Sequence, residues 1–425
     1  MADFILNDWH QILDPAPWAV RCLHRAVSAL GYIYICGGAS SQLGGATKYN
    51  DVWRSADGIT WELVTAAAGW SPRSAHGFMY YNNLFFVFGG ANAAGTFLRD
   101  VWSSPDCITW TQVSAAAPWT ARHEFACCEV DGKIMLSGGY GSFWAGYLSD
   151  VWETTDGSTW NLKCAAIDAA TMGPREHVMD VFNGSVWIYG GVWRGPGNHA
   201  TRLIYRSNDN GATWTNLGNA AWGKRKEHQV VKDSDNTRIA IIGGNDDVIP
   251  LNDVWETTDG INFTSIVQIN PFVARSDFAL VNHWYTTYII GGADNIGNGL
   301  QDVWSGYTEL FADFTGNPIV IHLGETVRFI NTSVGDVLFC MWNFGYASPF
   351  GLTYAMTSGM DGIDHKFMRV GIFTITLQVL FEDLSILRET KIGYITVLPY
   401  ELDFTGTPRN GRVPLRTRFT AELVE

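Results

Sequence analysis

Basic side chains are scarce in this sequence. Its 425 residues contain 28 Lys and Arg against 42 Asp and Glu, which gives a formal net charge of −14 at pH 7. A surface of this sign repels a phosphate backbone and an anionic lipid surface. The composition therefore argues against nucleic acid as a partner.

Long apolar runs and paired cysteines are also missing. No stretch approaches the roughly 20 apolar residues that a membrane-spanning helix needs, and residues 1–10 lack the basic start and apolar centre of a secretory signal. The seven cysteines are odd in number and contain no CxxC spacing, which argues against a disulfide framework or a zinc site. Free, mostly buried thiols are expected, with one bridge between Cys22 and Cys36 left open, and no metal or cofactor is expected.

Glycine and aromatic residues are plentiful, and the glycines repeat. The chain has 45 glycines, and Trp, Tyr and Phe make up 14% of it. A Gly-Gly pair ends an apolar, strand-like run six times, at steps of 48 to 53 residues. The pairs begin at Gly37, Gly89, Gly138, Gly190, Gly243 and Gly291.

Three further elements recur in the same register. Asp-Val-Trp follows five of the pairs, an Asp-Gly type of turn precedes an aromatic strand, and an arginine precedes the next apolar run. Each repeat therefore predicts four short antiparallel strands. The repeated aspartates are Asp51, Asp100, Asp150, Asp253 and Asp302, and the arginines are Arg21, Arg73, Arg122, Arg175, Arg225 and Arg275. In the fourth repeat Leu203-Ile204-Tyr205 replaces Asp-Val-Trp.

These registers resemble the kelch repeat over residues 1–307, and the resemblance implies a six-bladed β-propeller. The sixth repeat has no outer aromatic strand after Trp304, whereas Trp9 stands 12 residues before Arg21, as Trp61 does before Arg73. Residues 7–13 are therefore predicted to complete the last blade. This pairing of the two ends would remove an open sheet edge and close the ring.

Residues 311–398 resemble a polycystic-kidney-disease-type (PKD) domain. Trp342-Asn-Phe-Gly345 and the alternating run at 371–379 carry the resemblance, which implies an immunoglobulin-like (Ig-like) β-sandwich with a buried Trp. Residues 400–425 restart the motif but are too few for a core, so they are predicted to begin a second, truncated unit. The predicted fold class is all-β: a six-bladed kelch-like β-propeller closed by an N-terminal strand, plus an Ig-like PKD β-sandwich.

The repeated arginines and aspartates are predicted to be structural, because a residue that recurs in every blade serves the architecture. An anion-binding ring of arginines is the alternative. His24, His76 and His228 also share one repeat position, three residues after an arginine, and are predicted to belong to the framework.

Ligand-binding candidates lie in two loops that break the repeat. The loops after the third and fourth Gly-Gly pairs gather aromatic residues among glycines, which suits sugar stacking or a protein-binding hot spot. Packing over the ring or against the PKD-like domain is the alternative. The candidates are Tyr140, Phe143, Trp144, Tyr147, Trp193, Arg194 and His199.

No catalytic constellation is recognisable. The segment from Ser207 to Trp214 resembles the Asp-box of sialidase-type propellers, which is a hairpin lock and not an active site. The predicted function is therefore a non-enzymatic binding or structural protein whose partner is a protein or a glycan, with the PKD-like domain as a spacer or docking module. A homo-oligomer or larger assembly stays open.

Two other functions stay open: a secreted carbohydrate-active enzyme of sialidase-like or galactose-oxidase-like type, and an intracellular kelch adaptor. The expected location is a virion, as a decoration or tail-associated adhesin, or an extracellular surface. Purified virions without this polypeptide would count against the virion hypothesis.

Overall fold

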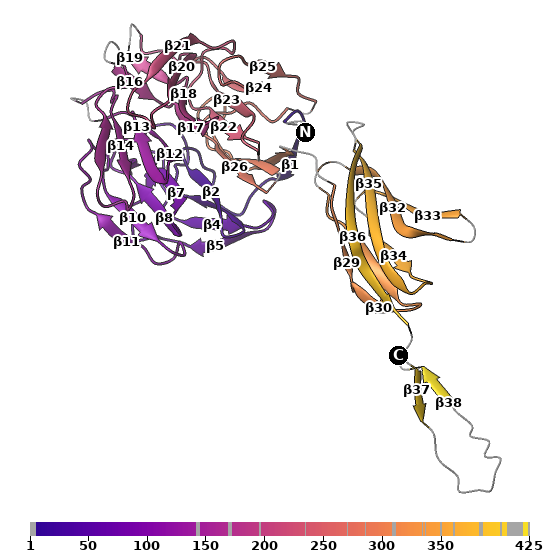
Figure 1. Ribbon diagram of the computed structural model, residues 1–425. Coiled ribbons are helices and arrows are strands. Elements are labelled where there is room, and N and C mark those ends of the chain that lie inside the picture. Colours follow the sequence, from indigo (N-terminus) through magenta and orange to yellow (C-terminus); the bar gives the residue numbers. More distant parts are fainter. Residues whose placement is uncertain are drawn as a thin grey trace, which may run out of the picture. The chain divides into compact units, whose positions relative to one another are not determined.

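The computed structural model divides the chain into two compact units, Asp3–Glu309 and Leu310–Glu425 (Figure 1). All regular elements among the described residues are β-strands, so no described helix is long and apolar enough to cross a membrane. The described residues are 6–141, 145–168, 172–194, 197–233, 235–269, 271–284, 286–307, 312–333, 335, 337–348, 351–359, 362–381, 386–399, 402–405 and 420–423.

The first unit contains six four-stranded antiparallel sheets. From its innermost to its outermost strand, the first sheet is β2 (Arg25–Ala29), β3 (Tyr32–Cys36), β4 (Val52–Ser55) and β5 (Trp61–Thr65). In the same order, the second is β7 (Gly77–Tyr81), β8 (Leu84–Phe88), β10 (Val101–Ser104) and β11 (Thr111–Ser114). The third is β12 (Ala126–Val130), β13 (Lys133–Ser137), β14 (Val151–Thr154) and β15 (Asn161–Cys164); the fourth is β17 (Val178–Phe182), β18 (Ser185–Tyr189), β20 (Leu203–Ser207) and β21 (Thr215–Asn219).

The fifth sheet is β22 (Gln229–Lys232), β23 (Ile239–Asn245), β24 (Pro250–Thr257) and β25 (Thr264–Ile266); the sixth is β26 (Ala279–His283), β27 (Thr286–Ile290), β28 (Val303–Tyr307) and β1 (Trp9–Leu13). Two short pairs lie outside these sheets: β6 (Arg73–Ser74) with β9 (Ala91–Asn92), and β16 (Met172–Arg175) with β19 (Val192–Arg194).

The six sheets are arranged in a closed circle. Their innermost strands contact one another in the cyclic order β2, β7, β12, β17, β22, β26 and back to β2 (Figure 1). A cavity of about 240 Å³ lies among these strands and is lined by residues such as Arg25, Phe78 and Gln229. We call the space that the six innermost strands surround the central channel.

The first strand of the chain lies in the last sheet. Strand β1 pairs antiparallel with β28, and Trp9 stands opposite Gly306. The Trp9 ring is buried and meets Phe272 edge-on, with ring centroids 5.4 Å apart. A Cβ atom on residue 306 would lie 2.9 Å from the Trp9 ring, so only glycine fits there.

The Gly-Gly pairs are needed for two reasons, which Gly37 and Gly38 illustrate. Both have positive φ, 62° and 97°, which side-chain-bearing residues rarely adopt. A Cβ on Gly38 would lie 2.7 Å from the Cβ of His24, and one on Gly37 would lie 2.6 Å from the His76 ring. The glycines therefore let one sheet lie directly against the buried histidine of the next.

The second unit contains two sheets that share one core. One sheet is β29 (Phe314–Asn317), β31 (Thr326–Asn331) and β34 (Ile363–Lys366). The other is β30 (Val320–His322), β36 (Ile386–Leu398), β35 (Gly371–Phe381), β32 (Val337–Ser348) and β33 (Gly351–Ser358). Trp342 is fully buried and meets Phe314 at 5.4 Å. Strands β37 (Leu402–Thr405) and β38 (Thr420–Leu423) pair only with each other.

All seven cysteines are free thiols. The bridge left open between Cys22 and Cys36 does not form: the Cys22 sulfur lies 3.6 Å from the Ala39 carbonyl oxygen, and the Cys36 sulfur lies 3.4 Å from Nε2 of His76. Burial raises the pKa of both thiols, so they stay protonated and unreactive.

The place of β1 in the sixth sheet predicts a large effect of Trp9→Ala. Removing a buried indole from a packed core should lower the free energy of unfolding by about 3–5 kcal/mol. Gln11→Ala, on the same strand but exposed, is the control and should cost little. Urea denaturation of the two variants measures the difference, and equal unfolding midpoints would show that β1 does not close the sheet.

Candidate functional site

Five of the repeated arginines form the same buried clamp. In the second sheet, Nη1 and Nη2 of Arg73 each donate to one Asp100 carboxylate oxygen at 2.8 Å, and Nη1 also donates to the Gly89 carbonyl at 2.9 Å. The indole N–H of Trp102 donates to Asp100 Oδ2. Burial by itself raises the pKa of Asp100, but the bonds from Arg73 and Trp102 outweigh it and hold the pKa below its usual value.

The same contacts recur in four other sheets, and all five arginine side chains are fully buried. A bidentate pair of this kind fixes geometry as well as charge. The clamps join the start of the innermost strand to the third strand of the same sheet. The four further pairs are Arg21–Asp51, Arg122–Asp150, Arg225–Asp253 and Arg275–Asp302.

The fourth sheet lacks the clamp, and the assignment of Arg175 to the repeated set is wrong. Pro174 occupies the arginine position, because its carbonyl accepts the N–H of Gly139 at 2.8 Å, the bond that the arginine carbonyls make elsewhere. Leu203 occupies the aspartate position by the same test, since its carbonyl accepts the N–H of Gly190. Both charges are lost together, so neither is left buried without a partner.

Trp193 replaces part of the clamp and is not an open stacking surface. Its indole N–H donates to the Gly190 carbonyl at 3.1 Å, the oxygen that an arginine would otherwise bind. Its ring stacks on Tyr205 with centroids 4.6 Å apart and is 5% exposed. The prediction that Trp193 contacts a ligand is therefore corrected: it packs inside the sheet.

Six residues, one before each innermost strand, form a closed ring of backbone hydrogen bonds. Each N–H donates to the carbonyl of the equivalent residue in the preceding sheet, at 2.9 to 3.2 Å, and the first donates to the last. Their φ angles all lie between 51° and 58°. We call this set the mouth ring: Leu23, Ala75, Glu124, Glu176, Glu227 and Asp277.

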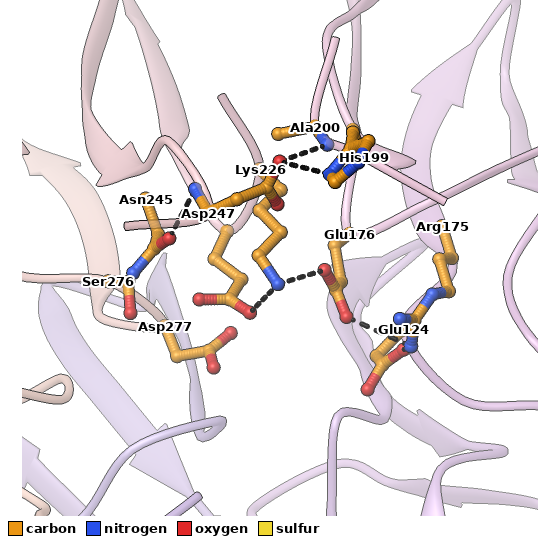
Figure 2. A network of polar contacts seen from close by, with 12 residues as sticks. Glu124, Arg175, Glu176, His199, Ala200, Lys226, Asn245, Asp247, Ser276 and Asp277 are labelled. Carbon is orange, nitrogen blue, oxygen red and sulfur yellow. Dashed lines mark hydrogen bonds and ion pairs between the residues drawn. The ribbon is translucent and has the colours of Figure 1, made fainter. Parts of the chain in front are cut away.

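Four of the six mouth-ring side chains are acidic, and Arg175 and Lys226 form ion pairs with them; Figure 2 shows these two cations near Glu124, Glu176 and Asp277. Nη1 of Arg175 lies 2.7 Å from Glu124 and 3.1 Å from Glu176. Nζ of Lys226 lies 3.4 Å from Glu176 and 3.4 Å from Glu227. If all six groups are ionised, the set therefore has an excess of two negative charges.

Burial makes this arrangement costly at neutral pH. Loss of solvation, and next the charge of Glu124, raise the pKa of Glu176 to about 7. Burial and the neighbouring Glu176 raise the pKa of Glu227, and burial and Glu227 raise the pKa of Asp277 well above its usual value. Glu176, Glu227 and Asp277 thus bind protons more readily in the folded propeller than in an unfolded chain.

An aromatic wall stands beside these charges. The Arg175 guanidinium lies 5.5 Å from the Tyr140 ring centroid and 5.4 Å from that of Tyr147. Phe97 stacks on His123 with centroids 4.4 Å apart, and His123 meets Tyr140 edge-on. Cation–π contacts of this kind hold Arg175 over the mouth ring.

The other predicted contact residues are dispersed. His199 is exposed and lies 3.4 Å from the Asp247 carboxylate, and Arg194 is exposed at the end of β19. Phe143 and Trp144 lie outside the described residues. Of the seven predicted residues, the structure therefore brings Tyr140 and Tyr147 together at the mouth ring.

A cavity of about 310 Å³ opens beside the mouth ring. Leu23, Gln42, Lys48, Phe97 and Glu124 are among its lining residues, which come from the loops after the first two Gly-Gly pairs and from the segments just before the first three innermost strands. Across the parts of the chain that the structure describes, no group of three or more His, Cys, Asp or Glu side chains could hold a metal ion.

Comparison with known families supports the fold assignment. Residues 23–221 match the family model described as the KLHDC2/KLHL20/DRC7 kelch-repeats domain, a little under half of the chain. The match and the six antiparallel sheets support a kelch β-propeller. No curated protein matches the sequence.

The four acidic residues of the mouth ring were not identified from the sequence, although their spacing from the repeated arginines could have indicated them. Glu124, Glu227 and Asp277 each stand two residues after a clamp arginine and just before the innermost strand of their sheet. Glu176 follows Arg175 directly, because Pro174 shifts the register by one residue. His177 stands only two residues after Arg175, whereas His24 stands three after Arg21, and this spacing reveals the shift.

The clamp and its absence from the fourth sheet predict a compensating pair of substitutions. Asp100→Ala leaves the Arg73 charge buried and unpaired, so it should lower the free energy of unfolding by about 3–5 kcal/mol. The double variant Arg73→Met/Asp100→Leu removes both charges and should cost less than the single variant. Urea denaturation tests this, and a double variant that is no more stable than Asp100→Ala would refute the coupling.

The raised pKa of Glu176 predicts that the propeller is more stable in mild acid. A carboxyl with a higher pKa in the folded state stabilises it at low pH and loses this contribution as the pH rises through about 7. The free energy of unfolding should therefore fall between pH 5 and pH 8, by up to about 3 kcal/mol from this group. Glu176→Gln should flatten the profile, whereas Glu129→Gln, at an exposed glutamate, should leave it unchanged.

Proposed function

We propose that this chain is a non-enzymatic binding protein in which a six-bladed propeller, closed by β1, presents its mouth face to a partner protein. The mouth face comprises the mouth ring and the loops that follow the Gly-Gly pairs. The second unit, an Ig-like sandwich of PKD type, would act as a spacer or docking module. The kelch-repeat match points to protein binding, because kelch propellers are protein-interaction modules.

The observation that carries this proposal is the asymmetry between the two ends of the channel. At one end, strands such as β2 and β3 are joined by a two-residue turn, Leu30-Gly31. At the mouth end, 15 residues separate Cys36 from Val52, and the loops there line the cavity of about 310 Å³. Irregular loops on a rigid scaffold are where binding residues concentrate.

A protein partner is favoured over a glycan. Sugar stacking needs open aromatic faces, but Trp193 is buried, and the rings of Tyr140 and Tyr147 flank the Arg175 guanidinium. Asp209 of the Asp-box accepts the backbone N–H and the hydroxyl of Thr213, which supports a role in the turn rather than in glycoside chemistry. The virion or extracellular-surface location stays a prediction from the sequence.

Selection of peptides from a random display library on the full chain tests the mouth face as the binding surface. Leu43 on the mouth face and Leu30 at the opposite end are matched controls, since their exposures are 59% and 57%. We expect selected peptides to bind the Leu43→Ser variant at least about tenfold more weakly, a change of about 1.4 kcal/mol, and to bind Leu30→Ser as well as the unchanged protein. Peptides that are insensitive to Leu43→Ser would overturn the proposal.

A further inference from the structure

We infer that the mouth face recognises a basic segment of its partner, in which a lysine or arginine side chain flanked by apolar residues is received by Glu227 and Asp277. The inference rests on the proposed function and adds the chemistry of the ligand. Its basis is the uneven distribution of charge around the mouth ring, together with an apolar rim that reaches the same two carboxylates.

Arg175 and Lys226 form their ion pairs on one side of the mouth ring. Arg175 lies between Glu124 and Glu176, and Lys226 lies between Glu176 and Glu227. Asp277 accepts a hydrogen bond from Nε2 of Gln42 at 2.6 Å, and within the described part of the chain no cation pairs with it. Asp277 is therefore the mouth-ring carboxylate without a paired cation among the described residues, and Arg25, which lines the same pocket as Glu227 and Asp277, forms no ion pair with either.

A buried carboxylate without a countercharge is unfavourable by several kcal/mol. In the free protein a proton relieves this cost, which is consistent with the raised pKa of Asp277. An incoming ammonium or guanidinium group would relieve it as well and would add charge-assisted hydrogen bonds. A carboxylate on the partner would instead increase the repulsion.

Apolar side chains stand on the rim above the same two carboxylates. The loops of the first and sixth sheets are joined by the bond from the Gln42 N–H to the Gly297 carbonyl, at 2.9 Å. Leu43 and Ile296, next to these residues, are 59% and 66% exposed. Exposed apolar residues grouped around a polar centre are typical of a protein-binding surface.

Gln42 connects the rim to the charged centre. Its backbone lies in the loop that carries Leu43, and Nε2 of its side-chain amide donates to Asp277 and lies 3.1 Å from the Ser276 hydroxyl and 3.3 Å from the Glu227 carboxylate. A basic side chain that enters beside Leu43 would therefore reach the place where the Gln42 amide already contacts both carboxylates. The neighbouring loop of the fifth sheet adds Val248, 78% exposed, to the apolar rim.

The negative charge of the chain and of the mouth ring favours a basic ligand at the mouth face. The chain has a net charge of −14, and the mouth ring adds a local negative centre, so a basic segment is attracted at long range and paired at short range. A peptide that is acidic or neutral throughout gains neither contribution. The inferred ligand is therefore a basic segment of a protein.

The test uses the tightest Leu43→Ser-sensitive peptide from the selection, synthesised with its basic residue as lysine, arginine, norleucine or glutamate. Binding to the full chain is measured by fluorescence anisotropy at low salt and at about 0.3 M salt, where screening is stronger. The lysine and arginine forms should bind at least about tenfold more tightly than the other two, which is about 1.4 kcal/mol, and the difference should shrink at high salt.

The double variant Glu227→Gln/Asp277→Asn should abolish this discrimination. Its matched control, Glu129→Gln/Asp131→Asn, makes the same change in charge at the opposite end of β12 and should leave binding unchanged. Thermal unfolding checks that each variant folds, and asparagine is compatible with the φ of 51° at residue 277. Should the double variant not fold, Asp277→Asn alone provides the same comparison.

The outcomes separate the two proposals. Leu43→Ser-sensitive peptides that lack a basic residue, or that bind Glu227→Gln/Asp277→Asn as well as the unchanged protein, would overturn the charge inference and leave the mouth face as a binding surface. A selection without any Leu43→Ser-sensitive peptide would overturn both.

Discussion

The backbone hydrogen-bond ring at the channel mouth is the constraint on which the rest of the structure depends. One residue from each of the six sheets gives its N–H to the preceding sheet and its carbonyl to the next, and the last bond returns to the first sheet. Because every member adopts a positive φ, each side chain leaves the ring in an equivalent direction. Chemistry at these six positions therefore converges on one place, although the residues stand about 50 positions apart in the sequence, the length of one kelch-type repeat.

The fourth sheet shows how a departure from the repeat becomes a feature of the site. Pro174 and Leu203 remove the buried Arg–Asp clamp, and Trp193 supplies the hydrogen bond that the missing arginine would have made. The arginine that follows the proline is then available to pair with Glu124 and Glu176 at the channel mouth. The departure from the repeat thus adds a positive charge to the mouth ring.

The carboxylates of the mouth ring that the proposed binding would use also lower the stability of the fold. Four carboxylates around one axis repel each other, and burial raises the pKa of Glu176, Glu227 and Asp277. The proposed binding site would therefore cost stability, as functional sites commonly do. In this propeller the five clamps and the buried aromatic layers between the sheets hold the charged ring in place.

The sequence alone determined the period, the four short strands in each repeat, the double glycines and the positions of the five clamp pairs, because these depend on local patterns that recur. Only the tertiary structure decided that Glu124, Glu176, Glu227 and Asp277 meet, that Arg175 pairs with two of them, and that Trp193 is buried. The physical reason is that each carboxylate is ordinary within its own repeat. Its burial and its raised pKa arise only when six sheets close around one axis and bring four like charges together.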